Sequence, residues 1–147
     1  MTKEEKYIAL VPKIRSLLSG ETDEIALMAN TAAMLHQEFG FWWTGFYRVN
    51  GSELVLGPFQ GPVACTRIQF GRGVCGTAYN TEETIVVPDV DKFPGHIACS
   101  SESRSEIVVP CWNNGRIVAV LDIDSRSLAN FDDTDKKYLE SIAALLY

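Results

Sequence analysis

The sequence predicts one α+β domain over residues 1–147, with a mostly antiparallel sheet and helices at both ends of the chain. Three observations indicate this class. Apolar residues recur at helical spacing near each terminus, strand-like patterns lie between them, and short Asn/Gly turns join those patterns into hairpins. A chain of 147 residues is typical of one domain and can bury a core without disulfides.

The N-terminal part of the chain predicts two helices. Apolar residues recur at helical spacing over residues 7–18, and Ser19-Gly20 ends that run. A second run covers residues 25–39, with Thr22 as the expected N-cap and Gly40 as its end.

The middle of the chain predicts short strands and long connections. Residues 41–49 are typical of a strand, and Asn50-Gly51 is a hairpin signal into a second strand at 54–56. Residues 57–76 are rich in glycine, proline and polar residues. A short helix is expected at 74–82 and a short strand at 84–87. Residues 89–103 have no regular pattern, and irregular segments of this length are usually functional or mobile.

A second hairpin and a final helix complete the domain. Strands at 104–112 and 116–124 flank a loop at 113–115, a register that places Glu106 opposite Asp122. A slip by one residue would mix polar and apolar side chains on each face. In the expected register, without that slip, the apolar side chains of both strands share the face opposite the carboxylates: Ile107, Val109, Cys111, Ile117, Ala119 and Leu121. The last helix is expected to begin near Asp132.

Composition excludes some classes of protein. Lys plus Arg number 13 against 19 Asp plus Glu, and this net charge of −6 argues against nucleic-acid binding. No apolar run approaches the length of a membrane span. The N-terminus lacks the apolar core of a signal peptide, so a cytoplasmic location with reduced thiols is expected.

One glycine motif resembles a phosphate-binding loop. Gly71, Gly73 and Gly76 satisfy G-x-G-x-x-G. A dinucleotide site needs that motif inside a βαβ unit, whereas antiparallel hairpins flank it here. The glycines are therefore interpreted as a tight turn into a short helix.

The four cysteines are Cys65, Cys75, Cys99 and Cys111. None has C-x-x-C spacing, and with two histidines in the chain a zinc site is not expected. Cys111 alternates with apolar residues and is expected in the core. The other three lie in Gly/Pro/Ser-rich segments, where a thiol would be accessible to small molecules and to other thiols.

Carboxylates and aromatic residues form a second candidate group. Asp122 and Asp124 lie two apart on a strand, so they share a face roughly 7 Å apart, and the hairpin adds Glu106 to that face. Trp43 and Tyr47 share a face of the first strand. If the first strand adjoins the hairpin, an aromatic wall meets an acidic cluster whose members raise one another's pKa. Such a site suits a zwitterionic ligand.

The run FWWTGFYRVNGSELVLGPFQGPVACTRIQFGRGVCGTAYNTEETIVVPDVDKFPGHIACSSESRSEIVVP, followed by LDIDS, resembles the free methionine-(R)-sulfoxide reductases. That resemblance covers the chain from the second helix to the last and includes the spacing of three cysteines. It implies a single GAF domain with a central, mostly antiparallel sheet. The N- and C-terminal helices would pack on one face and the active-site loops on the other, commonly in a homodimer.

The resemblance also implies roles for individual residues. Cys99 corresponds to the catalytic nucleophile, Cys65 to the resolving cysteine, and Cys75 to a third cysteine with a possible part in recycling. The implied substrate-binding residues are two aromatic and three acidic side chains: Trp43, Tyr47, Glu106, Asp122 and Asp124.

The implied reaction reduces free L-methionine-(R)-sulfoxide through a sulfenic acid and an intramolecular disulfide, with thioredoxin as reductant and no metal or organic cofactor. His96, three residues before Cys99, is interpreted as an exposed loop residue. Two alternatives stay open. The first is a non-catalytic GAF sensor of a small ligand. The second is a redox switch in which Cys65 and Cys99 form a regulatory disulfide without turnover.

Overall fold

The computed structural model describes residues 1–96 and 101–147. Its helices are α1 (Lys3–Leu18), α2 (Glu24–Phe39), α3 (Gly73–Thr81) and α4 (Asp133–Ala143), with a 3-10 turn at Val90–Lys92. Its strands are β1 (Trp43–Asn50), β2 (Glu53–Gln60), β3 (Arg67–Gln69), β4 (Ile85–Val87), β5 (Ser105–Asn113) and β6 (Arg116–Ser125).

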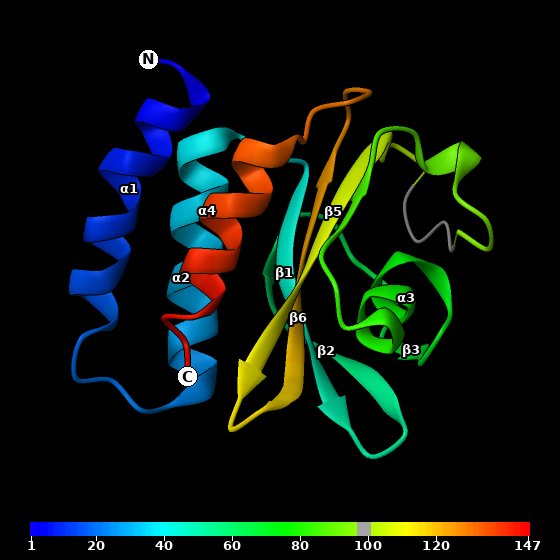
Figure 1. Ribbon diagram of the computed structural model, residues 1–147, viewed down its shortest axis with the longest axis horizontal. Coiled ribbons are helices and arrows are strands. Elements are labelled where there is room, and N and C mark those ends of the chain that lie inside the picture. The colour runs from blue at the N-terminus through cyan, green and yellow to red at the C-terminus, as the bar shows by residue number, and fades with distance from the viewer. Residues whose placement is uncertain (97–100) are drawn as a thin grey trace.

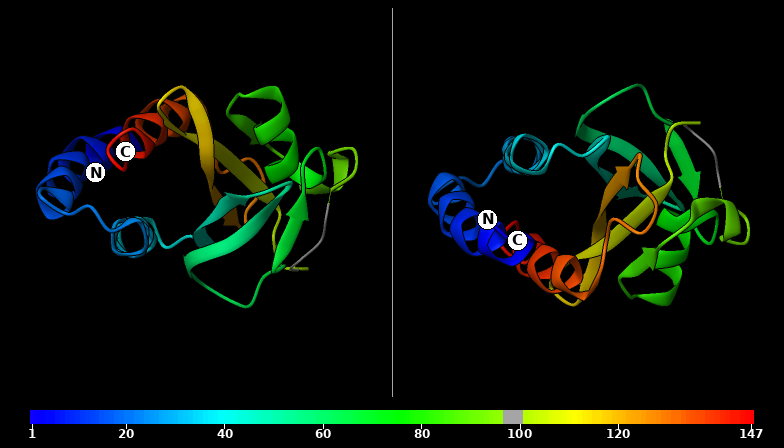
Figure 2. Two further views of the ribbon diagram at one scale, coloured as in Figure 1. Left: turned by 90° about the horizontal axis from the view of Figure 1, so that it is seen from below. Right: turned by 90° about the horizontal axis from the view of Figure 1, so that it is seen from above.

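The described strands form one antiparallel sheet in the order β3-β2-β1-β6-β5-β4. Helices α2 and α4 cover one face of this sheet and α1 packs outside them, whereas α3 lies on the opposite face (Figure 1). Both termini lie in the helical layer, as two further views show (Figure 2). The predicted α+β class, with terminal helices on one face, is confirmed. No helix in the described ranges is long and apolar enough to span a membrane.

Most helix ends follow the expected signals. Gly40 ends α2 in the left-handed conformation, as expected. The N-cap of α2 is Asp23 and not Thr22, because the Asp23 side chain accepts a hydrogen bond from the Ala26 N–H at 3.0 Å. Helix α4 begins directly after Asp132, whose side chain caps it.

Strand β2 is longer than expected and β3 was not expected at all. The register of the β1–β2 pairing shifts between Gly45 and Tyr47. Gly57 and Pro58 lie at this irregularity, where no regular hydrogen bond of the sheet is required. This irregularity lets β2 continue to Gln60. Strand β3 is only three residues long and pairs at the sheet edge, which is too short for a sequence pattern to reveal.

The β5–β6 register differs from the expected one by two residues. Glu106 pairs with Asp124, not with Asp122. One residue of the shift comes from a shorter turn, because Asn113 pairs with Arg116, and the other from a bulge next to Cys111. A shift by one residue exchanges the two faces of a strand, and a second shift restores them. The faces of the central residues were therefore predicted correctly, although their cross-strand partners were wrong. Ile117 lies beyond the bulge and packs on the opposite face from the expected one.

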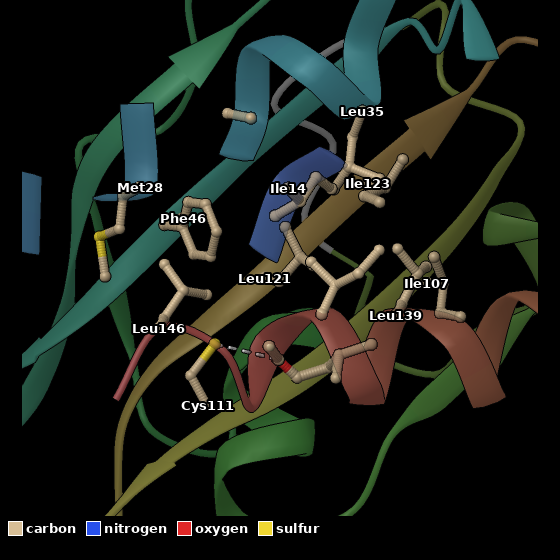
Figure 3. Close-up of a cluster of buried hydrophobic side chains, with 14 of the residues drawn as sticks. Ile14, Met28, Leu35, Phe46, Ile107, Cys111, Leu121, Ile123, Leu139 and Leu146 are labelled. Atoms are coloured by element: carbon tan, nitrogen blue, oxygen red, sulfur yellow. Dashed lines mark hydrogen bonds between the residues drawn. The ribbon is translucent and has the colours of Figure 1, made fainter. Parts of the chain in front are cut away.

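A large apolar layer fills the space between the sheet and the helices α1, α2 and α4 (Figure 3). Phe46, Leu121 and Ile123 point into it from the sheet, and Leu35 and Leu139 point into it from the helices. Cys111 is completely buried there, as expected for a small apolar residue, and burial raises the pKa of its thiol to about 12.

The glycine motif forms the tight turn into α3. Gly73 has φ of 62°, a conformation that favours glycine. A Cβ on Gly76 would lie 2.5 Å from the Gln69 carbonyl oxygen, so this position has no room for a side chain. The strands next to α3 pair antiparallel, and the described chain contains no βαβ unit around the motif. These contacts support a structural role for the glycines.

Candidate active site

A pocket opens on the sheet face that carries α3. It is lined by residues of β1, β3, α3, β5 and β6 together with four connecting segments: Trp42, Trp43, Tyr47, Val63, Ala64, Ile68, Arg72, Gly73, Val74, Cys75, His96, Ser103, Glu106, Asp122 and Asp124. The structure thus brings together all five residues expected to bind substrate, from three different strands.

Pairing of β1 with β6 places the aromatic wall beside the carboxylates. Trp43 pairs with Asp124, and Gly45 pairs with Asp122. The Trp43 and Tyr47 rings are stacked with centroids 5.9 Å apart. A Cβ on Gly45 would come within 2.7 Å of the Trp43 ring, so glycine at this position lets the indole lie flat over the strand.

The polar ends of the two aromatic residues hold the segment that contains Cys65. Trp43 Nε1 donates to the Pro62 carbonyl at 3.0 Å, and the Tyr47 hydroxyl donates to the Cys65 carbonyl at 2.8 Å. Burial raises the pKa of Tyr47, and the nearby carboxylates raise it further, so the hydroxyl keeps its proton for this bond. Cys65 itself is half-buried and disulfide-bonded.

Glu106, Asp122 and Asp124 form an acidic cluster at the base of the pocket. Glu106 and Asp122 are each 6% exposed. Burial raises the pKa of all three carboxyls, and the charge of Asp122 raises the pKa of Glu106 and Asp124 further. Ser103 Oγ donates to Asp124 Oδ1 at 3.2 Å. Raised pKa values favour the protonated form of these carboxyls, and a protonated carboxyl can donate its proton to a bound ligand.

Cys75 lies in the first turn of α3 and is only 3% exposed, so the expectation of an accessible loop thiol was wrong. The glycine-dependent turn starts the helix just before this residue and carries its side chain inward. Burial and the neighbouring carboxylates raise the pKa of its thiol well above the usual value. Cys75 is therefore a neutral thiol and a poor nucleophile.

Cys75 also belongs to a group of donor atoms that sequence spacing could not reveal. Its Sγ and carboxylate oxygens of Glu106 and Asp122 lie within 4.8 Å of one another, close enough to approach a metal ion. Before a metal ion could bind, the Cys75 thiol and the Glu106 carboxyl would have to lose their protons, and the raised pKa values of both groups oppose that loss.

His96 lines the pocket and its side chain is 15% exposed, so the interpretation as an exposed loop residue was wrong. Its Nε2 lies 3.9 Å from Glu106 Oε1. Arg72 and Ser103 also line the pocket and were not expected there. No periodic pattern marks these three residues, since all lie outside the regular strands and helices. Cys99, the expected nucleophile, lies outside the described residues.

Comparisons with known proteins agree with this architecture. The GAF domain family matches residues 23–146. A GAF domain-containing protein A of Dictyostelium discoideum is 58% identical, with 99% of this chain and 92% of that protein covered. The free methionine-R-sulfoxide reductase of Escherichia coli is 45% identical, with coverage of 99% and 89%.

A solved structure is also similar over nearly the whole chain. It is the free methionine-R-sulfoxide reductase of Neisseria meningitidis in complex with its substrate, with a TM-score of 0.98 and 55% identity. The alignment covers 99% of this chain and 89% of that one. The chain belongs to the GAF domain family, in the group that contains the free methionine-R-sulfoxide reductases.

Proposed function

We propose that this protein reduces free L-methionine-(R)-sulfoxide to L-methionine. The observation that carries the proposal is the meeting of the Trp43–Tyr47 wall with an acidic cluster of raised pKa inside one pocket. The aromatic wall suits the methyl-thio end of the substrate, and the cluster supplies a proton where the sulfoxide oxygen gains negative charge. Membership in a group that contains named reductases supports the same conclusion.

The proposed reaction begins with nucleophilic attack. The Cys99 thiolate attacks the sulfoxide sulfur while a carboxyl of Glu106, Asp122 or Asp124 protonates the oxygen. The sulfur–oxygen bond breaks, the oxygen leaves methionine as the hydroxyl of a Cys99 sulfenic acid, and methionine departs. Sulfur in the substrate is reduced and the cysteine sulfur is oxidised by the same two electrons.

The second half of the reaction restores the enzyme. The Cys65 thiol condenses with the sulfenic acid, water leaves, and a Cys65–Cys99 disulfide forms. Cys65 suits this role because its backbone is held at the pocket by Tyr47 and because its sulfur is disulfide-bonded in the structure. An external dithiol then reduces the disulfide, and thioredoxin is the reductant we expect. The burial of Cys75 argues against a direct part in this exchange.

The remaining expectations from the sequence stay predictions. They are a homodimer, a cytoplasmic location, one domain over residues 1–147, and chemistry without a metal or organic cofactor.

A chiral assay tests the proposed function. The protein is incubated with racemic free methionine sulfoxide and a dithiol, and each epimer is followed by chromatography. We expect the R epimer alone to disappear, so that consumption stops near half of the total. Persistence of both epimers, while the protein still forms a reversible disulfide under oxidant, would contradict the proposal and favour the redox switch. Persistence of both epimers without such a disulfide would favour the ligand sensor.

A further inference from the structure

Cys75 is a buried residue of the pocket to which the proposed reaction gives no role. Its side chain is 3% exposed, and its Sγ lies within 4.8 Å of carboxylate oxygens of Glu106 and Asp122, which lie within the same distance of each other. The three donors come from α3, β5 and β6, so the sheet and the turn into α3 fix their spacing. Cysteine sulfur and carboxylate oxygen are both ligands of Zn²⁺ in proteins.

A second observation at this place also points to a bound cation. Asp122 is 6% exposed, and its Oδ1 is buried without a hydrogen-bond partner among the described residues. A buried acceptor without a partner costs free energy, which a bond to a cation recovers. The carboxylates of Glu106, Asp122 and Asp124 also repel one another when they are ionised, and a divalent ion beside them would offset that repulsion.

The kinds of donor atom decide which cation fits. Mg²⁺ and Ca²⁺ prefer six or more oxygen ligands, whereas this group offers one sulfur and two carboxylates. Zn²⁺ takes four ligands in a tetrahedron and accepts sulfur, nitrogen and oxygen. A nitrogen lies next to the group, because His96 Nε2 is 3.9 Å from Glu106 Oε1. His96 or a water molecule can therefore complete a tetrahedral zinc site.

We propose that Zn²⁺ binds to Cys75, Glu106 and Asp122 and thereby inhibits the protein, an inference whose second half rests on the proposed function. The thiol, and each carboxyl that is protonated, releases its proton to solvent as the bond to the ion forms. The raised pKa values oppose this release, but the charge of the ion reverses the balance, because a thiol that binds a metal ion is deprotonated outright. The ion then occupies two carboxylates that the proposed reaction needs. It is an inhibitor and not a cofactor, so the expectation of a reaction without a metal is unchanged.

Co²⁺ is the probe of binding, because a thiolate that binds Co²⁺ gives a charge-transfer band in the near ultraviolet. The titration uses a protein with Cys65→Ser and Cys99→Ser, so that no thiol of the proposed reaction can bind the ion. Displacement of Co²⁺ by Zn²⁺ then gives the zinc affinity. Cys75→Ser in this background removes the proposed ligand. Cys111→Ser is the matched control, because it removes another buried thiol, from the apolar layer.

The charge-transfer band should be present with Cys111→Ser and absent with Cys75→Ser. Loss of a residue that hydrogen-bonds to a metal ligand weakens metal binding about 10–100-fold, so loss of the Cys75 ligand itself should weaken Zn²⁺ binding at least about 100-fold. Asp122→Asn is a second variant that keeps the size of the side chain, and it should also weaken Zn²⁺ binding. Mg²⁺ should not displace Co²⁺. Thermal unfolding checks that each variant is folded.

Single turnovers of the reduced protein test the inhibition without an external dithiol, which would itself bind zinc. Zn²⁺ should raise the concentration of free methionine-(R)-sulfoxide that gives half of the maximal rate, because ion and substrate compete for the same carboxylates. A saturating concentration of substrate should restore the rate. The same Zn²⁺ concentration should slow the Cys75→Ser protein much less, with each protein compared with its own rate without zinc.

The outcomes separate the metal site from the proposed function. Absence of the band, or a band that persists with Cys75→Ser, would overturn the metal site. A band that depends on Cys75, together with turnover that Zn²⁺ does not slow, would refute the inhibition. If the band behaves as expected but no sulfoxide is reduced even without zinc, the metal site stands and the proposed reductase function fails.

Discussion

The two faces of one sheet carry different properties of this protein. On β6, Leu121 and Ile123 point into the apolar layer under the helices, whereas Asp122 and Asp124 point into the pocket. The two free thiols among the described residues follow the same division, with Cys111 in the apolar layer and Cys75 at the pocket. Because side chains alternate between the two faces of a strand, adjacent residues of β6 belong to the apolar layer and to the pocket in turn. A substitution on the apolar side should mainly lower stability, and a substitution of its neighbour should mainly lower activity.

The largest expected effect comes from the two cysteines of the proposed reaction, Cys99 and Cys65. Cys99→Ser should abolish reduction of the sulfoxide, because a hydroxyl is not a competent nucleophile under these conditions. Cys65→Ser should complete one turnover and then recycle poorly, because the sulfenic acid has lost its resolving thiol. Quench-flow measurement of methionine, with and without reductant, distinguishes the two. Cys111→Ala is the matched control and should turn over normally, while an active Cys99→Ser protein would refute the assignment of the nucleophile.

Adjacent residues of β6 provide the sharpest test of the comparison. Leu121→Ala should lower the free energy of unfolding by about 2–5 kcal/mol, since it leaves a cavity in the apolar layer, and change kcat/KM little. Asp122→Asn should lower kcat/KM about 10–100-fold through a weakened contact with the ligand. Its free energy of unfolding should change much less. Chemical denaturation and steady-state kinetics on both variants measure these effects. If each variant lost both stability and activity, the proposed difference between the two faces of β6 would be contradicted.

The acidic cluster should also give the pocket face a pH-dependent stability. Folding raises the pKa of Glu106, Asp122 and Asp124, so the folded chain binds more protons than the unfolded chain above about pH 4, where free carboxyls titrate. The cluster's contribution is therefore greatest below that pH and is lost as pH rises through the folded-state pKa values. Urea denaturation across pH should show a flatter dependence for Glu106→Gln than for the wild type. Leu121→Ala should keep the wild-type slope, and an unchanged slope in Glu106→Gln would contradict the raised pKa.

A smaller effect should distinguish the cysteines by their reactivity. After reduction, a thiol-alkylating reagent should modify Cys65 faster than Cys75 or Cys111, because the last two are buried and have raised pKa values. Mass spectrometry of native and unfolded samples measures the three rates, which should become similar on unfolding. Equal labelling of Cys65 and Cys75 in the native protein would show that Cys75 is accessible and restore it as a candidate for recycling.

The sequence predicted the faces of the strands better than their partners. The face of Glu106 depends only on alternation, which the pattern of apolar residues reveals. Its partner depends on a two-residue turn and a bulge next to Cys111, and neither leaves a signal in hydrophobicity. From the sequence, the aromatic wall and the acidic cluster could be placed in one site only if β1 adjoins the hairpin. The pairing of β1 with β6 fulfils that condition.

Residues outside regular elements were the least predictable part of the site. His96 was expected to be exposed because it lies in an irregular segment, yet tertiary contacts turn it toward Glu106. Cys75 was expected to be accessible because glycines surround it, yet those glycines form the turn that buries it. In both cases the environment is set by contacts with distant strands, and local composition carries no information about those contacts.

A single turnover without external reductant tests the central claim most directly. Reduced protein is mixed with excess free methionine-(R)-sulfoxide, methionine is counted per chain, and the disulfide formed is identified by peptide mass mapping. The account predicts one methionine per chain together with a Cys65–Cys99 disulfide. Absence of methionine, or a product disulfide that contains Cys75 in place of Cys65, would contradict it.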